Sequence, residues 1–169
     1  MAASTQTQID SAAQAWIKLV LKAKSIELQR MLVRREAWQI TAELNSGDKA
    51  SYFLRIDRDA LRGEPGTRGL KRESDLMRCL AEHSQIPIPK VLAWSDEHCI
   101  AIQSFVSGRA DLNNAAPEEQ HSVMQHFMDI LAEMHQIDVD QFNLEGFELP
   151  STAEEHSLIE LDAVDSQVD

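Results

Sequence analysis

Several residues of types that can do chemistry occur in this sequence, but their spacing does not suit it. His121 and His126 lie five residues apart, a poor spacing for two ligands of one metal on a helix. Cys79 and Cys99 show neither a metal-binding spacing nor a disulfide framework. We interpret His121 and His126 as surface residues and His135 as a packing or capping residue near a helix end. These residues predict no metal site.

Arg55 offers a different chemistry. A guanidinium presents a fixed fork of N–H donors, so one arginine can contact a phosphate and a carboxylate together. Arg55 lies in segment 52–57, where apolar and polar residues alternate as in a half-buried strand. Because it falls on the opposite side from the apolar residues Leu54 and Ile56, a solvated surface arginine is the alternative interpretation.

The charges are distributed unevenly along the chain. All 16 Lys and Arg lie at or before Arg109, together with 13 acidic residues, so this part carries a net charge of +3. Residues 110–169 contain 15 acidic residues and no Lys or Arg. This second part would repel phosphate, which argues against nucleic-acid binding. The mildly basic first part could attract a small anionic ligand.

Composition and hydropathy predict a cytoplasmic protein. The chain has 169 residues, enough for one good core, and 43% of them are hydrophobic. No apolar run approaches the length of a membrane span. The first ten residues lack the basic start and apolar stretch of a signal peptide. We expect both cysteines to be reduced.

Hydrophobic periodicity predicts the order helix, hairpin, helix, hairpin, helix. The predicted helices are residues 12–27, 70–83 and a third that begins at Pro117, and residues 58–67 read as a loop. The predicted strands are 37–44 and 52–57, joined by the turn 45–48, then 91–94 and 99–106. This order predicts an α+β domain with an antiparallel sheet and a helix packed against it.

Five short motifs, in order, resemble those of the aminoglycoside phosphotransferase and choline kinase-like family, which has a protein-kinase-like fold. They are the strand Tyr52–Asp57, the helix Leu70–Leu80, the segment Ile86–Leu92 with its two prolines, the segment Gln103–Gly108, and Leu131–His135. The resemblance covers roughly residues 12–145. It implies an N-terminal helical segment (1–30), a nucleotide-binding small lobe (31–108), and a hinge exit, first large-lobe helix and acidic tail (109–169).

The resemblance also implies an activity and a set of binding residues. The activity would be ATP-dependent phosphorylation of a hydroxyl on a small molecule. Such a site pairs a strand cation with a helix carboxylate, here Arg55 and Glu73. An extended segment of four residues would present backbone groups to adenine: Gln103, Ser104, Phe105 and Val106. An ordinary core strand is an equally good interpretation of that segment.

The phosphate-covering loop departs from the family pattern. Met31 and Leu32 occupy places where relatives have glycines that let backbone amides approach phosphate closely. Arg34 and Arg35 could supply positive charge there instead. Any ATP binding is therefore expected to be weak.

The residues that perform catalysis in this family are missing. The chain contains no His-Gly-Asp triplet, and Asp162 and Asp165, in an acidic tail, lack the context of a magnesium-binding loop. We therefore predict no catalytic or metal-binding residues and no turnover by this chain alone. The alternatives are a non-catalytic kinase-like binding module and an anionic scaffold that self-associates through residues 119–136. In that segment Val123, Phe127, Ile130, Leu131 and Met134 form an apolar stripe, which would otherwise pack against residues 12–27.

Overall fold

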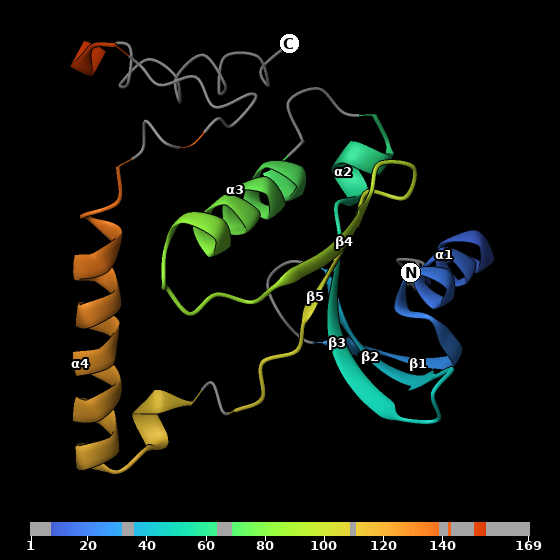
Figure 1. Ribbon diagram of the computed structural model, residues 1–169, viewed down its shortest axis with the longest axis horizontal. Helices are drawn as coiled ribbons and strands as arrows, with labels where there is room; N and C mark the ends of the chain where they lie inside the picture. The colour runs from blue at the N-terminus through green and yellow to red at the C-terminus, as the bar shows by residue number, and fades with distance from the viewer. Residues whose placement is uncertain are drawn as a thin grey trace, which may run out of the picture.

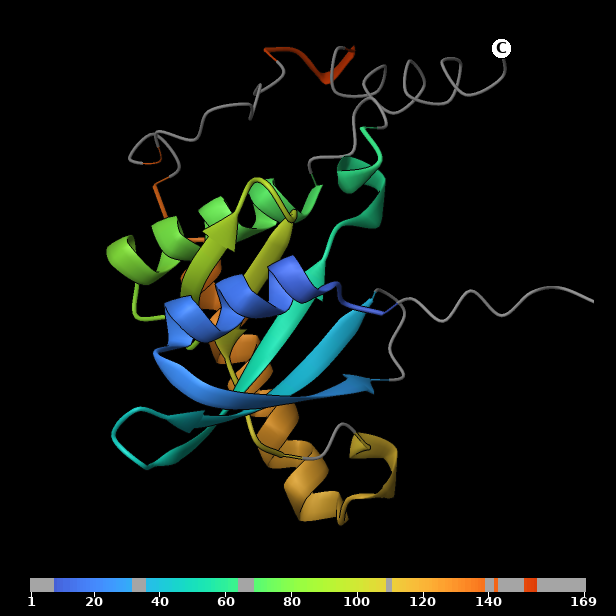
Figure 2. The same cartoon turned by 90° about the vertical axis from the view of Figure 1, so that its right-hand side faces the viewer.

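A computed structural model describes residues 8–31, 36–63, 69–108, 111–138, 142 and 151–154. Within these ranges a five-stranded sheet in the order β1-β2-β3-β5-β4 carries helices on its faces and at one end (Figures 1 and 2). All four strand pairings are antiparallel. The predicted α+β fold is confirmed.

The first helix and the first three strands form one packed unit. Helix α1 (Ser11–Leu21) precedes the meander β1 (Ala23–Met31), β2 (Ala37–Leu44) and β3 (Lys49–Ile56). Asp10 starts the helix, because its carboxylate accepts a hydrogen bond from Ala13 N at 2.8 Å. The buried face of α1 packs on one face of the sheet, on side chains that include Ile40, Leu54, Ile100 and Ile102. Burying such a side chain stabilises the fold by about 1.5–3 kcal/mol.

The prediction of one helix over residues 12–27 is wrong beyond Leu21. Lys22 adopts a left-handed conformation with φ of 53° and ends the helix, and residues 23–31 continue as strand β1. Ile26 and Leu28 are partly buried while Glu27 and Gln29 are exposed, which is the two-residue period of a strand. Pairing of β1 with β2 overrode a helical pattern that the same residues also fit.

The two predicted hairpins are present. Residues 45–48 connect β2 to β3 through a turn in which Gly47 has a φ of 96°, a conformation that favours glycine. The second hairpin is β4 (Val91–Ser95) with β5 (Ile100–Ser104), and β5 pairs with β3 in the middle of the sheet. The segment expected to be a loop from residue 58 begins instead with one helical turn, α2 (Arg58–Leu61).

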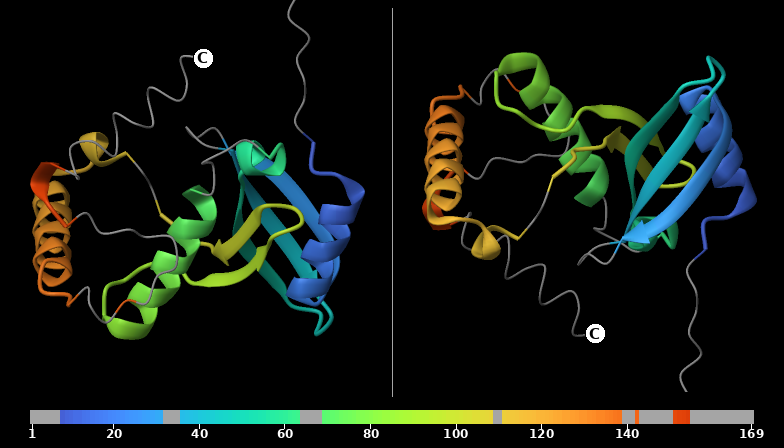
Figure 3. Two further views of the ribbon diagram at one scale, coloured as in Figure 1. Left: turned by 90° about the horizontal axis from the view of Figure 1, so that it is seen from above. Right: turned by 90° about the horizontal axis from the view of Figure 1, so that it is seen from below.

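Helix α3 (Gly69–His83) confirms the second predicted helix. It lies beside β4 and β5, on the side of the sheet away from α1 (Figure 3). Successive side chains of a strand point to opposite faces of the sheet, so residues two apart share a face. Here one face is covered by α1 and the other by α3. Leu54 and Ile56 of β3 therefore face α1, whereas Phe53 and Arg55 face the α3 side.

The third predicted helix is also present, as α4 (Pro117–Met134), after a short 3-10 helix (Leu112–Asn114). It does not pack against α1, so that one of the two predicted alternatives is wrong: the two helices lie at opposite ends of the molecule (Figures 1 and 3). The reason is that α1 already buries its apolar face, including Ile17, on the sheet. Within α4 no side chain is buried, and Phe127 is 55% exposed.

Candidate functional site

Arg55 and Glu73 form an ion pair between β3 and α3. Nη1 of Arg55 donates to Oε1 of Glu73, which confirms the prediction that the two side chains lie within ion-pair reach. Their side chains are 14% and 37% exposed, so the arginine is largely buried while the carboxylate remains open to solvent. A guanidinium has five N–H donors, and one that pairs with a carboxylate can still bind a phosphate.

Helix α3 makes a second contact one turn further along. Met77 lies four residues after Glu73, and its Sδ accepts a hydrogen bond from Gln103 Nε2 at 3.4 Å. Gln103 is 4% exposed and lies opposite Phe53 across the β3–β5 ladder, hence on the same face as Arg55. The structure thus brings Arg55, Glu73 and Gln103 together on one side of the sheet, under one helix.

The expected adenine-binding segment leaves β5 beside this face. Ser104 makes two hydrogen bonds to the backbone of Lys90. Its backbone N–H donates to Lys90 O at 2.8 Å, and its hydroxyl accepts from Lys90 N at 2.9 Å. The next two residues, Phe105 and Val106, lie beyond the last strand residue, and Val106 is 69% exposed. The backbone groups of these two residues are therefore better placed for a ligand than those of Ser104.

The predicted contribution of Arg34 and Arg35 lies outside the described residues, as do Asp162 and Asp165. The histidines His121 and His126 are exposed on α4, and His135 is its C-cap, as expected. In the part of the chain that the structure covers, no three His, Cys, Asp or Glu side chains gather into a possible metal site. No helix among the same residues is long and apolar enough to cross a membrane.

Sequence reasoning missed a second ion pair, at the other face of the same strands. Glu36 accepts two hydrogen bonds from Arg58, from Nε at 2.9 Å and from Nη2 at 2.8 Å, and a third from Trp38 Nε1 at 3.0 Å. The backbone oxygen of Glu36 also accepts from Ile56 N at 3.4 Å. Glu36 directly precedes β2 and Trp38 is the second residue of that strand, a spacing that puts both side chains on one face.

The charges of this second pair stabilise each other. Burial by itself raises the pKa of Glu36, but hydrogen bonds from Arg58 and Trp38 and the nearby positive charges outweigh it, so the pKa is lowered. The hydrogen bond to Glu36 correspondingly raises the pKa of Arg58, against an opposing effect of burial. The pair is therefore fully ionised at neutral pH.

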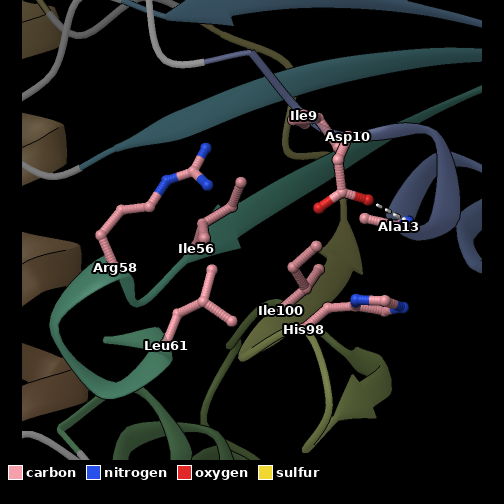
Figure 4. Close-up of a pocket in the computed structure, with 8 residues that line it drawn as sticks. All are labelled: Ile9, Asp10, Ala13, Ile56, Arg58, Leu61, His98 and Ile100. Carbon is pink, nitrogen blue, oxygen red and sulfur yellow. Dashed lines mark hydrogen bonds between the residues drawn. The ribbon is translucent and has the colours of Figure 1, made fainter. Parts of the chain in front are cut away.

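A small cavity lies beside Arg58, on the α1 face of the sheet (Figure 4). Asp10 and Arg58 approach it from different elements, and the Asp10 carboxylate is already engaged with Ala13. The other lining residues are Ile9, Ala13, Ile56, Leu61, His98 and Ile100. Since Arg55 faces away from α1, this cavity is separate from the Arg55–Glu73 site.

Asp57 is the other residue that sequence reasoning missed. It lies between β3 and α2, and its carboxylate caps α2 by accepting a hydrogen bond from Ala60 N at 3.0 Å. An aspartate directly after a strand is a recognisable N-cap signal, and this signal could have revealed the short helix.

Two comparisons with known proteins bear on this site. The model of the phosphotransferase enzyme family (APH) matches residues 37–169, which include both Arg55 and Glu73. A probable acyl-CoA dehydrogenase of Arabidopsis thaliana is 30% identical over 114 residues, or 62% of this chain. The chain covers 14% of the length of that relative.

Proposed function

Because the chain belongs to the phosphotransferase enzyme family, we propose that it is the nucleotide-binding portion of an ATP-dependent small-molecule phosphotransferase. The observation that carries the proposal is the Arg55–Glu73 ion pair, which joins a central strand to the helix above it. Phosphoryl transfer depends on positioning and charge stabilisation, and a guanidinium held in place by a carboxylate serves both.

The proposed nucleotide site has two parts. Arg55, oriented by Glu73, binds a phosphate, and the backbone of Phe105 and Val106 binds the edge of adenine. Gln103 and Ser104 form the base of that segment through their contacts with Met77 and Lys90. Arg34 and Arg35 add positive charge near the phosphates. In this division residues 31–108 are the nucleotide-binding small lobe and residues 109–169 lead into the large lobe, while the helical segment 1–30 also contributes most of β1.

The proposed reaction transfers the γ-phosphoryl group of ATP to a hydroxyl. The acceptor oxygen forms a bond to phosphorus, the bond to the bridging oxygen breaks, ADP leaves and the hydroxyl proton is released. Magnesium would neutralise phosphate charge in such a reaction. The described residues do not gather three potential metal ligands, so we derive no step through magnesium for this chain.

We further propose that residues 1–169 alone do not complete the reaction. Arg55 and Glu73 orient a nucleotide but supply neither a base for the acceptor hydroxyl nor a metal site. Positioned acid–base help contributes roughly 10²–10⁴-fold to a rate, so its loss leaves binding with little chemistry. An ADP-release assay with magnesium tests this, with aminoglycosides, choline, sugars and a hydroxyacyl-CoA as acceptors. We expect no acceptor-dependent release of ADP. The last acceptor is included because the relative is named as a probable acyl-CoA dehydrogenase.

The binding proposal is tested by isothermal titration of ATP, with and without magnesium. We expect weak binding by the unmodified chain and a loss of about tenfold in affinity for Arg55→Ala, as for a hydrogen bond between charged groups. The matched control is Arg78→Ala, which removes an arginine of α3 that pairs with Asp75 instead. Equal affinities for the two variants would contradict a phosphate-binding role for Arg55.

A second candidate function, a self-associating module, is favoured by the exposure of α4. Val123, Phe127 and Met134 are 45%, 55% and 45% exposed on a helix with no buried residue. An apolar stripe of this size on a monomer is unfavourable in water. Sedimentation of the chain and of Phe127→Glu tests this candidate: association lost in the variant supports it, and a monomer in both cases contradicts it.

A further inference from the structure

Asp57 connects the two elements that carry the Arg55–Glu73 pair. It follows β3 directly and lies two residues after Arg55. Its backbone N–H donates to the carbonyl of Cys99 at 3.0 Å, in the turn between β4 and β5. The main chain of Asp57 is thereby fixed to the sheet.

The carboxylate of Asp57 contacts the starts of two helices at once. One oxygen, Oδ1, accepts from Ala60 N at 3.0 Å and caps α2. The other oxygen, Oδ2, accepts from Leu70 N at 3.4 Å, in the first turn of α3. A negative charge at a helix N-terminus is favourable because of unpaired N–H groups and the helix dipole.

Leu70 is well placed to transmit this contact to Glu73. It is 4% exposed, and its carbonyl accepts a hydrogen bond at 2.8 Å from the hydroxyl of Ser74, which is fully buried. Glu73 precedes Ser74 and lies three residues after Leu70, in the same helical turn. Holding Leu70 therefore fixes the position of Glu73 along and around the helix axis.

We infer that Asp57 is a positioning residue for the Arg55–Glu73 pair. One rigid side chain sets the distance between the end of the strand that carries the arginine and the start of the helix that carries the glutamate. This role rests on the proposed function for its effect on nucleotide binding, but its effect on the ion pair is independent of any ligand.

Capping alone is the competing explanation, and the chain offers a matched control for it. Asp10 caps α1 in the same manner, by accepting from Ala13 N at 2.8 Å, but it lies on the face away from Arg55. Serine can replace aspartate as an N-cap. In Asp57→Ser the single hydroxyl oxygen takes the place of Oδ1 at Ala60, and the contact with Leu70 is lost. Asp10→Ser undergoes the same chemical change without touching α3.

The first measurement needs no nucleotide. Urea unfolding of Arg55→Ala, Glu73→Ala and the double variant gives the coupling between the two residues, and the cycle is repeated in the Asp57→Ser and Asp10→Ser backgrounds. We expect the coupling to fall below roughly half in Asp57→Ser and to persist in Asp10→Ser. An unchanged coupling in Asp57→Ser would overturn the inference. So would an equal loss in both backgrounds.

The second measurement is the Kd for ATP of the same proteins. We expect Asp57→Ser to raise Kd about three- to tenfold, as expected for losing a positioning hydrogen bond, and Asp10→Ser to leave it unchanged. If the unmodified chain shows no Arg55-dependent binding, the proposed function fails while the coupling cycle still decides the positioning role. Should Asp57→Ser not fold, Asp57→Asn serves instead, because it keeps an oxygen for Ala60 and turns an N–H toward that of Leu70.

Discussion

An arginine–carboxylate pair lies on each side of the sheet next to β2 and β3, and the two pairs differ in how far their carboxylates are exposed. On the α1 face, Glu36 accepts three side-chain hydrogen bonds from Arg58 and Trp38, and its side chain is 11% exposed. On the α3 face, Arg55 Nη1 donates to Glu73 Oε1, and the Glu73 side chain is 37% exposed.

Under the proposed function, this difference separates a structural pair from a pair that binds a ligand. The carboxylate of Glu36 accepts three hydrogen bonds and connects the start of β2 to α2. These bonds stabilise the folded state. Arg55 is held in a defined position but retains donors of its guanidinium fork, which suits a phosphate. The two pairs lie only three residues apart along the chain, at Arg55 and Arg58. Arg55 lies in β3 and Arg58 in the helix α2 that follows it, and the two side chains pair with carboxylates on different faces of the sheet.

The largest effect on stability is expected for Glu36→Ala. This change removes three hydrogen bonds and leaves Arg58 without its carboxylate, so the free energy of unfolding should fall by about 2 kcal/mol. Urea denaturation measures it. The control is Glu43→Ala near the other end of β2, where the carboxylate accepts a hydrogen bond from Ser25 at an exposed position. A loss as large in the control would show that the Glu36 pair is not special.

Arg55→Lys should separate the contribution of charge from that of geometry at the Arg55–Glu73 pair. Lysine keeps the positive charge but lacks the fork, so it cannot hold Glu73 and a phosphate in the same way. We expect ATP affinity to fall by about three- to tenfold, less than for Arg55→Ala, with little change in the free energy of unfolding. Titration calorimetry and urea denaturation measure the two quantities. Full affinity in the lysine variant would mean that charge alone suffices.

The pH dependence of stability should reveal the contribution of the Glu36–Arg58 pair. The pKa of Glu36 is lower in the folded protein than its ordinary value of 4.5. Its contribution is therefore fully present above pH 4.5 and is lost as the pH falls through the lowered pKa. Urea denaturation between pH 7 and pH 3 should show a steeper loss for the unmodified chain than for Glu36→Gln. Parallel curves would contradict the assignment.

The smallest effect is expected at an exposed pair of the same chemistry. Arg78 contacts Asp75 at 3.3 Å on α3, with side chains 42% and 32% exposed. Solvent screens such a pair, so Arg78→Ala should change the free energy of unfolding by no more than about 0.5 kcal/mol. Urea denaturation of Arg78→Ala and Glu36→Ala then shows how the contribution of an ion pair to the free energy of unfolding depends on its burial. A change as large as that of Glu36→Ala would contradict the expectation that the more buried pair contributes more.

Much of the fold follows from the sequence because the patterns are local. The alternation in segments 37–44 and 52–57, the turn at Gly47 and the apolar period of 70–83 each depend on neighbouring residues, and all three predictions were confirmed. The error at residues 22–27 arose where a short segment fits two periods. Only the hydrogen bonds that β2 offers along its edge select the strand.

The site divides in the same way. Guanidinium chemistry allows an arginine to bind a phosphate and a carboxylate together, but the strand pattern alone left Arg55 equally open to being a solvated surface residue. The resemblance to a family made Arg55 a candidate phosphate ligand and supplied Glu73 as its partner. The contacts of Asp57 with Leu70 and of Glu36 with Arg58 span 13 and 22 residues, and no local pattern encodes them. Tertiary structure decided them, because it alone sets which side chains from distant segments come within hydrogen-bonding distance.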